Sequence, residues 1–151
     1  MINLTIVKEW NIGNPGYNSN VTATLYSDGE LDIASAAGGS KMVDFGDPAE
    51  GEAPWKLEGY HTSIKNVYIV NVGNIGNRAF KDCSNLVSVT FYNNYLKIIG
   101  RRAFDKCTSL QEIKIPNKCY GNRKRSVSGV QQIDNNHKSK PDTANSRREL
   151  F

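Results

Sequence analysis

The sequence has little histidine, with two residues in 151, and lacks long apolar runs. His61 lies beside Tyr60 and His137 lies in the tail, so neither has a nucleophile or a carboxylate at a catalytic spacing. No apolar run approaches the roughly 20 residues that cross a bilayer, and residues 1–10 lack the basic and then apolar order of a signal peptide. The sequence therefore predicts a non-enzymatic protein without a membrane span.

Cysteine is also scarce, and the three residues cannot all pair within one chain. Cys83 and Cys107 occupy apolar positions, and no C-x-x-C pair is present. Free cysteine at such positions behaves as a small hydrophobe, so we expect buried thiols rather than a disulfide or a metal site. Cys119 lies beyond the last expected strand, where we expect it to be exposed.

Motifs for metals and cofactors are absent as well. The acidic residues Asp44, Asp47, Glu50 and Glu52 lie in one loop, but their spacing is not that of a twelve-residue calcium loop. Residues 73–76 contain two glycines but lack the following Lys-Ser or Lys-Thr of a phosphate-binding loop. We therefore predict no catalytic residue, no metal and no cofactor.

Positive charge is concentrated at one end of the chain. Residues 117–151 contain eight lysines or arginines against three acidic residues, whereas residues 1–116 contain eleven against twelve. The nearly neutral body gives no sign of a nucleic-acid groove, although a basic arm can contact phosphates. The end of the chain is also poor in large apolar residues, a composition typical of disorder.

A seventeen-residue segment occurs twice in the sequence. Residues 75–91 read IGNRAFKDCSNLVSVTF, and residues 99–115, which begin 24 residues later, read IGRRAFDKCTSLQEIKI. Every apolar position of the second copy is also apolar in the first, and each copy ends in a Leu-x-x-apolar-x-apolar motif. Such a period and motif are typical of leucine-rich repeats, whose units bury their apolar faces by stacking on one another.

Each copy predicts one strand and one short helical turn. In the first copy, alternation places Val89 and Phe91 on the core side of a strand and Thr90 on the outer side. Phe80 and Cys83 lie three residues apart between the Ile-Gly pair and the strand, a spacing that puts both on one side of a helical turn.

A partial third copy precedes the two full ones. Residues 64–69 read IKNVYI, with the same strand spacing, and lie 22 residues before the matching residues of the first full copy. We therefore expect at least three stacked rungs. The two full copies also carry opposite charges at matched positions, with Lys-Asp in the first copy and Asp-Lys in the second. Stacking therefore predicts that Asp82 lies beside Lys106 and that Lys81 lies beside Asp105.

The phrase Ile-Gly-x-x-Ala-Phe-x-x-Cys-x-x-Leu, followed by a strand, resembles the BspA-like class of leucine-rich repeats, which is common in bacterial surface proteins. The strand-like residues 21–33 are similar to the β-rich segment that precedes the first repeat in many such proteins. The resemblance covers residues 20–116. It implies a β-rich α/β repeat solenoid: a short right-handed stack of parallel strands and short helical turns, capped by an N-terminal β-hairpin region.

Three regions follow from these patterns. Residues 1–59 form a β-rich cap, with a hairpin at the Ser27-Asp28-Gly29 turn and an acidic loop held by Trp55 against the first rung. Residues 60–116 form the repeat rungs. We expect residues 117–151 to form a basic, largely disordered tail, in which residues 127–133 can dock on the last rung.

Stacking aligns the outward side chains of the strands in two columns. These side chains form a polar strip that we expect to bind a partner, and aromatic area of the kind that interfaces favour is among them. The predicted binding residues are Asn66, Ser88 and Glu112 in one column, Tyr68, Thr90 and Lys114 in the next, and Tyr92 in the adjoining turn.

These observations predict a non-catalytic protein-recognition or adhesion module that binds a host or bacterial surface protein through its strands. The alternatives are a structural spacer without its own ligand and a protein that contacts nucleic acid through its basic tail. The resemblance implies a cell-surface or extracellular location, which a leader removed ahead of Met1 would reconcile with the sequence; a cytoplasmic protein is the alternative. An edge-to-edge dimer through the end of the stack is a further alternative.

Overall fold

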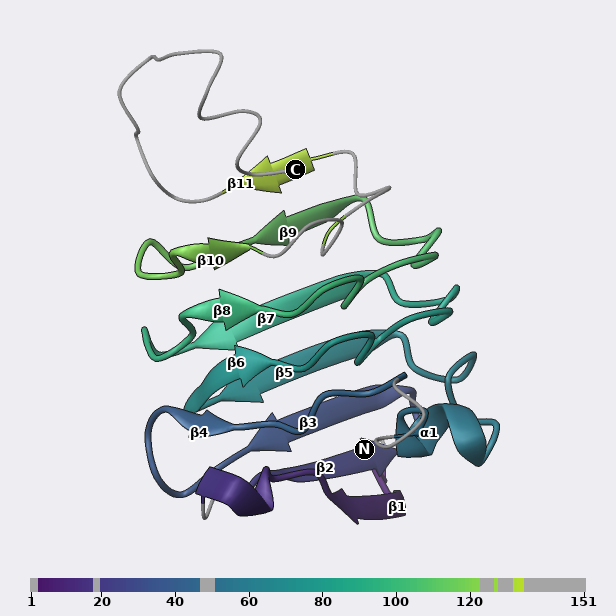
Figure 1. Ribbon diagram of the computed structural model, residues 1–151. Coiled ribbons are helices and arrows are strands. Elements are labelled where there is room, and N and C mark those ends of the chain that lie inside the picture. The colour runs from purple at the N-terminus through teal and green to yellow at the C-terminus, as the bar shows by residue number, and fades with distance from the viewer. Residues whose placement is uncertain (1–2, 18–19, 47–50, 123–126, 128–131, 135–151) are drawn as a thin grey trace.

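Strands make up most of the regular secondary structure of the computed structural model, which describes residues 3–17, 20–46, 51–122, 127 and 132–134 (Figure 1). The elements are β1 (Ile6–Asn11), η1 (Pro15–Tyr17), β2 (Thr22–Tyr26), β3 (Glu30–Ala34), β4 (Ser40–Lys41), α1 (Pro54–Leu57), β5 (Asn66–Val70), β6 (Val72–Ile75), β7 (Ser88–Tyr92), β8 (Ile98–Ile99), β9 (Glu112–Lys114), β10 (Gly121–Asn122) and β11 (Gln132–Asp134). The only α-helix of the described residues is the four-residue α1. No helix among them is long and apolar enough to cross a membrane.

The strands lie in layers that rise from the N-terminal to the C-terminal end of the stack (Figure 1). One sheet has the order β1-β2-β3-β5-β7, in which β1, β2 and β3 are antiparallel and β3, β5 and β7 are parallel. A second sheet has the order β10-β8-β6-β4 and is parallel throughout. The rungs that begin with β3, β5 and β7 therefore each contribute one strand to each of these two sheets. The last rung contributes β10 to the second sheet, whereas its strand β9 pairs with β11 in a third sheet.

The β2–β3 hairpin forms at the turn that the sequence predicts. Gly29 has a φ of 90°, which glycine adopts without steric cost. The Asp28 carboxylate accepts a hydrogen bond from the backbone N–H of Glu30 at 3.0 Å. A Cβ at Gly29 would lie 2.6 Å from the carbonyl oxygen of Ser63, so glycine also allows the first rung to approach the hairpin closely.

The predicted helical turns are wrong, because these segments form consecutive tight turns instead. Arg78 and Asp82 have φ values of 53° and 66°, and their counterparts in the next rung are also positive. A left-handed residue every fourth position interrupts a helix. The backbone N–H groups of Arg78, Phe80 and Asp82 instead donate to carbonyls at positions 101, 103 and 105 of the next rung. The turns thus form a third hydrogen-bonded side of the stack.

Asparagines hold the corner at which β5 and β7 end. Asn71 and Asn93 both have positive φ, at 62° and 69°, which asparagine tolerates better than most residues. The Asn93 amide donates to the Asn71 side-chain oxygen at 2.6 Å, and the Asn71 amide donates to the carbonyl of Ser35 at 2.9 Å. This short side-chain ladder joins three consecutive rungs at one corner.

A column of aromatic rings runs through the core. Trp55 stacks on Phe80 with ring centroids 5.5 Å apart, and Phe80 stacks on Phe104 at 5.3 Å. All three side chains are fully buried, and the Trp55 indole N–H donates to the carbonyl of Ala79 at 2.8 Å. The prediction that Trp55 packs against the repeats is confirmed, and the rung that it contacts is that of the first full copy. Its ring supplies a third member of the column, although it precedes the repeats in sequence.

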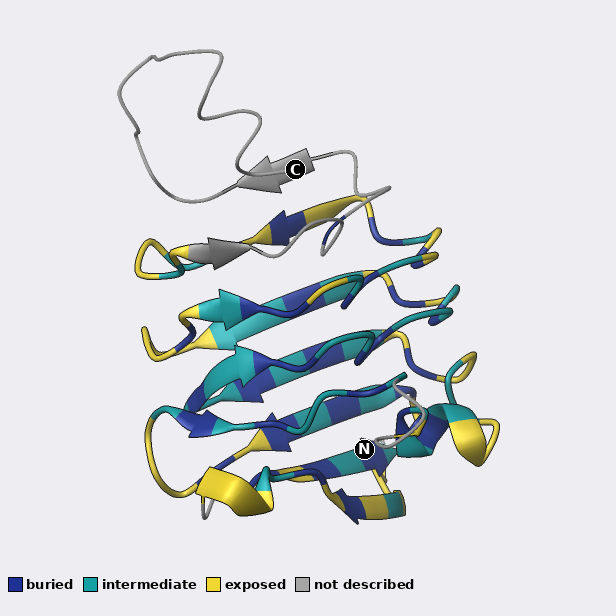
Figure 2. Ribbon diagram, viewed as in Figure 1, coloured by how far each residue is buried: buried dark blue, intermediate teal, exposed yellow. Residues whose placement is uncertain are grey.

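The repeated apolar residues are buried within the stack, and Figure 2 shows buried positions in dark blue recurring from layer to layer. With one exception, the matched pairs of the two full copies are buried, and the exception is Phe91, which is half-buried. The buried matched residues are Ile75, Ala79, Phe80, Cys83, Leu86 and Val89 in the first copy and Ile99, Ala103, Phe104, Cys107, Leu110, Ile113 and Ile115 in the second.

Cys83 and Cys107 are buried free thiols, as the sequence predicts. The Cys107 Sγ donates to the carbonyl of Phe80 at 3.0 Å. Burial raises the pKa of the Cys83 thiol well above its ordinary value, and burial raises that of Cys107 to about 12. Cys119 is half-buried against the core, so the expectation of an exposed thiol is wrong there.

The stack continues beyond Pro116. The strand β10 pairs in parallel with β8, and β11 pairs in parallel with β9. Val127, in the segment that the sequence analysis places over the last rung, is buried. Residues 123–126, 128–131 and 135–151 lie outside the described part of the chain, so the disorder expected for the tail remains a prediction.

Replacing Phe104 by alanine should lower the free energy of unfolding by about 3–5 kcal/mol, because it removes a fully buried ring from the column and leaves a cavity. Urea denaturation followed by tryptophan fluorescence would measure the change. A Phe104→Ala protein with an unchanged midpoint would contradict the packing described here.

The two buried thiols should react very slowly with Ellman's reagent at pH 8. Their raised pKa values leave almost no thiolate at that pH, and burial hinders approach of the reagent. A Cys119→Ser variant isolates these two thiols, and both should react at once in denaturant. Rapid modification of the native variant would show that the core is open.

Candidate functional site

The strongest candidate site is the outward surface of β3, β5, β7 and β9, which we call the strand face. Alternation along β5 buries Val67 and Ile69 and turns Asn66 and Tyr68 outward. Parallel pairing repeats this pattern from strand to strand. The strand face consists of Glu30, Asp32, Asn66, Tyr68, Ser88, Thr90, Tyr92, Glu112 and Lys114.

The register aligns the first members of both predicted columns. Asn66 lies opposite Ser88, and Tyr68 lies opposite Thr90. The Ser88 hydroxyl donates to the Asn66 side-chain oxygen at 2.8 Å. The Tyr68 ring stacks on Tyr92, with centroids 6.2 Å apart and planes 24° apart. The polar and aromatic side chains thus form a continuous surface across these two strands.

The last members of the columns lie across a groove. The strand β9, which carries Glu112 and Lys114, is not hydrogen-bonded to β7 but pairs with β11. The turns of the same two rungs keep their backbone hydrogen bonds. The rungs therefore separate only on the strand face, where a groove of about 740 Å³ is lined by Val87, Ser88, Val89, Thr90, Thr108, Ser109, Gln111, Glu112 and Lys114.

Two acidic residues extend the strand face in a way that the sequence analysis missed. Because β3 pairs in parallel with β5, Glu30 lies opposite Asn66 and Asp32 lies opposite Tyr68. Burial and then the charges of Asp32 and Asp28 raise the pKa of Glu30. Burial and then Asp28 raise the pKa of Asp32. The alternation in residues 30–33 reveals which side chains share a face, but not the pairing of β3 with a strand that begins more than thirty residues later.

The Tyr68 hydroxyl lies near these carboxylates. Partial desolvation raises its pKa, and the charges of Glu30, Tyr92, Asp32 and Asp28 raise it further. Tyrosine is neutral at physiological pH with or without this shift. The shift therefore reports the surroundings of the ring, which are electronegative on the side of β3.

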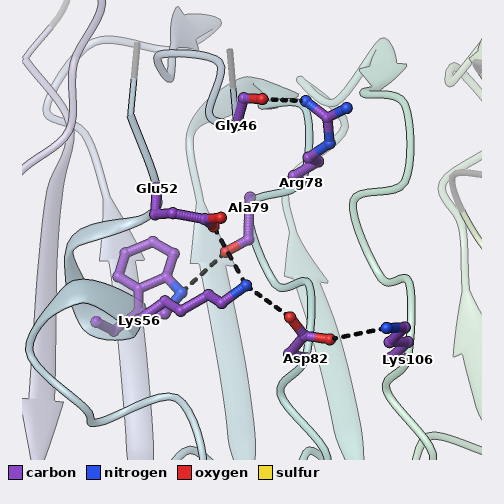
Figure 3. A network of polar contacts seen from close by, with 8 residues as sticks. Gly46, Glu52, Lys56, Arg78, Ala79, Asp82 and Lys106 are labelled. Atoms are coloured by element: carbon purple, nitrogen blue, oxygen red, sulfur yellow. Dashed lines mark hydrogen bonds and ion pairs between the residues drawn. The ribbon is translucent and has the colours of Figure 1, made fainter. Parts of the chain in front are cut away.

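A second polar cluster lies on the turn side of the stack (Figure 3). The Lys56 ammonium lies 2.6 Å from Asp82 and 3.3 Å from Glu52, and Lys106 lies 4.0 Å from Asp82. The predicted contact of Asp82 with Lys106 is confirmed. Burial would raise the pKa of Asp82, but Lys56, with support from Lys81 and Lys106, outweighs burial and lowers it. The charges balance one another, so this cluster joins the helix α1 to the rungs.

The other groups considered from the sequence do not assemble into a reactive site within the described residues. Among these residues no three His, Cys, Asp or Glu side chains lie close enough to hold a metal ion. The Asp44 carboxylate accepts from the backbone N–H of Asn77 at 2.7 Å, and Glu52 pairs with Lys56. Asp47, Glu50 and His137 lie outside the described residues.

Comparison with known proteins identifies the repeats. The family model described as "BspA type Leucine rich repeat region (6 copies)" matches residues 60–141. A crystal structure of a leucine-rich repeat protein from Eubacterium ventriosum is similar, with a TM-score of 0.53 and 17% sequence identity. The similarity covers 83% of this chain but 44% of that protein, so the chain spans less than half of its length. No curated protein matches the sequence.

Proposed function

The chain belongs to the BspA-type leucine-rich-repeat family, and from this premise we propose that it is a non-catalytic protein-recognition module that binds through its strand face. Leucine-rich repeats generally mediate protein interactions, and extended surfaces of stacked repeats suit this role. The stack would be a short right-handed solenoid, with the strand face as one of its sides. A location at or outside a bacterial cell surface, with a role in adhesion, fits the family.

One observation supports the proposal: in the parallel pairing of β5 with β7, Asn66 lies beside Ser88 and Tyr68 lies beside Thr90 on one hydrogen-bonded sheet. Tyr92 is 50% exposed and stacks on the half-buried Tyr68, so aromatic area is held in place before any partner arrives. Immobilised side chains lose little conformational entropy on binding, which favours affinity. The Ser88–Asn66 hydrogen bond fixes neighbouring polar groups in the same way.

The mechanism of recognition would be rigid display. The aromatic core column holds the rungs, the rungs hold the strand register, and the register sets the spacing of the side chains that meet the partner. The groove between β7 and β9 offers a concave part to this surface, where a partner can become well desolvated. No step requires a metal, a cofactor or a nucleophile.

A triple variant of the strand face tests the proposal. Tyr68→Ala, Thr90→Ala and Lys114→Ala should abolish capture of a partner from bacterial-surface and extracellular-matrix extracts, because interface energy is concentrated in a few anchors. The readout is the set of proteins retained by the immobilised intact chain but not by the variant, compared at equal thermal stability.

A matched control carries Lys97→Ala, Arg101→Ala and Tyr120→Ala, which alter exposed residues on the side of β8 and β10. This control should retain the same proteins as the intact chain. Identical retention by the strand-face variant would contradict the proposal and favour a structural spacer. If partner proteins were lost only when residues 117–151 were deleted, the result would assign binding to the basic tail.

A further inference from the structure

The Tyr68–Tyr92 pair is the part of the strand face with the most defined geometry. The rings are nearly parallel, at 24°, and Tyr68 lies opposite Asp32 of β3 in the register. Tyr92 remains half exposed. Stacked aromatic rings with an open edge or face attract cations through the ring quadrupole.

The neighbouring carboxylates form no ion pair with another described residue. Asp28, Glu30 and Asp32 lie within electrostatic range of one another, and no lysine or arginine of the described residues forms an ion pair with any of them. The contrast with the turn side is clear, because there Glu52 and Asp82 both have a lysine partner. Like charges gathered without compensation favour a cationic partner.

The groove continues the surface beyond the tyrosines. Thr90, which lies opposite Tyr68 in the register, also lines the groove between β7 and β9. Beyond Thr90 the lining is rich in hydroxyl and amide groups, including Ser88, Ser109 and Gln111. Hydroxyl and amide groups can hydrogen-bond a peptide main chain.

We propose that the strand face binds an extended peptide segment of a partner protein, with an arginine side chain of that segment held between the Tyr68–Tyr92 pair and the carboxylates of Glu30 and Asp32. The peptide crosses the parallel strands and continues over the groove between β7 and β9. This inference rests on the proposed function and specifies the chemistry of the partner.

Arginine fits these surroundings better than lysine does. The guanidinium is planar, stacks on aromatic faces and donates bidentate hydrogen bonds to carboxylates, whereas the ammonium of lysine is a compact and strongly hydrated charge. The strand face presents both partners for arginine, rings and carboxylates, on adjacent strands. Burial is the larger cause of the raised pKa of Glu30 and Asp32, and binding would offset the second cause, which is repulsion from neighbouring carboxylates.

Fluorescence anisotropy with labelled peptides tests the inference on the full chain. The probes are a Gly/Ser peptide with two arginines and matched peptides with two lysines or two glutamines at the same positions. The arginine peptide should bind at least about tenfold more tightly than the glutamine peptide and more tightly than the lysine peptide. Equal binding of the arginine and glutamine peptides, or no binding of either, would overturn the inference.

Single substitutions locate the binding site. Asp32→Asn and Tyr68→Leu should each weaken the affinity for the arginine peptide about tenfold. Tyr68→Phe keeps the ring and should change this affinity less than about threefold. Asp105→Asn removes one carboxylate from the turn side and serves as the matched control. An equal loss with Asp105→Asn would show that the peptide responds to net charge, which would overturn the assigned site.

The two proposals can fail separately. If the arginine peptide did not bind but the strand-face triple variant lost its partner, only the proposed arginine contact would be contradicted. The proposal that the strand face binds a protein would stand. Specific binding of the arginine peptide to a chain whose triple variant still captures every protein would support the inference at the level of peptides and contradict the wider proposed function.

Discussion

The rungs of this protein cannot bury their apolar side chains alone, and every other feature of the structure depends on this constraint. Phe80 covers Trp55 and Phe104 covers Phe80, each from the following rung, and all three rings are fully buried. Trp55 allows the column to begin before the first full repeat. Because burial of such rings provides much of the hydrophobic stabilisation, loss of one contact weakens its neighbours too.

The same packing sets the geometry of the strand face. Backbone hydrogen bonds on three sides of the stack hold the rungs in register, and on the strand side they place Asp32, Tyr68 and Thr90 in one row. Where β7 and β9 lack that pairing, the register continues on the turn side and a groove opens on the strand side. A surface for recognition and a concave feature within it thus arise from the stacking of the repeats.

The repeat made the architecture predictable from sequence, since matched apolar positions in residues 75–91 and 99–115 can be buried only by stacking. Local patterns also located the β2–β3 hairpin and the buried thiols. The predicted helical turns were wrong because left-handed residues such as Arg78 and Asp82 carry no strong sequence signal. The acidic part of the strand face was missed because it depends on a long-range pairing of β3 with β5, which alternation within Glu30–Ile33 does not reveal.

The central claim, that the rungs stabilise one another through the ring column, is tested most directly by a double-mutant cycle on Phe80 and Phe104. The free energies of unfolding of Phe80→Leu, Phe104→Leu and the double variant would be measured in urea and compared with that of the intact chain. Contact between the rings at 5.3 Å predicts a coupling energy of about 1 kcal/mol. Strictly additive effects would contradict the claim and would mean that each rung is stabilised independently of its neighbour.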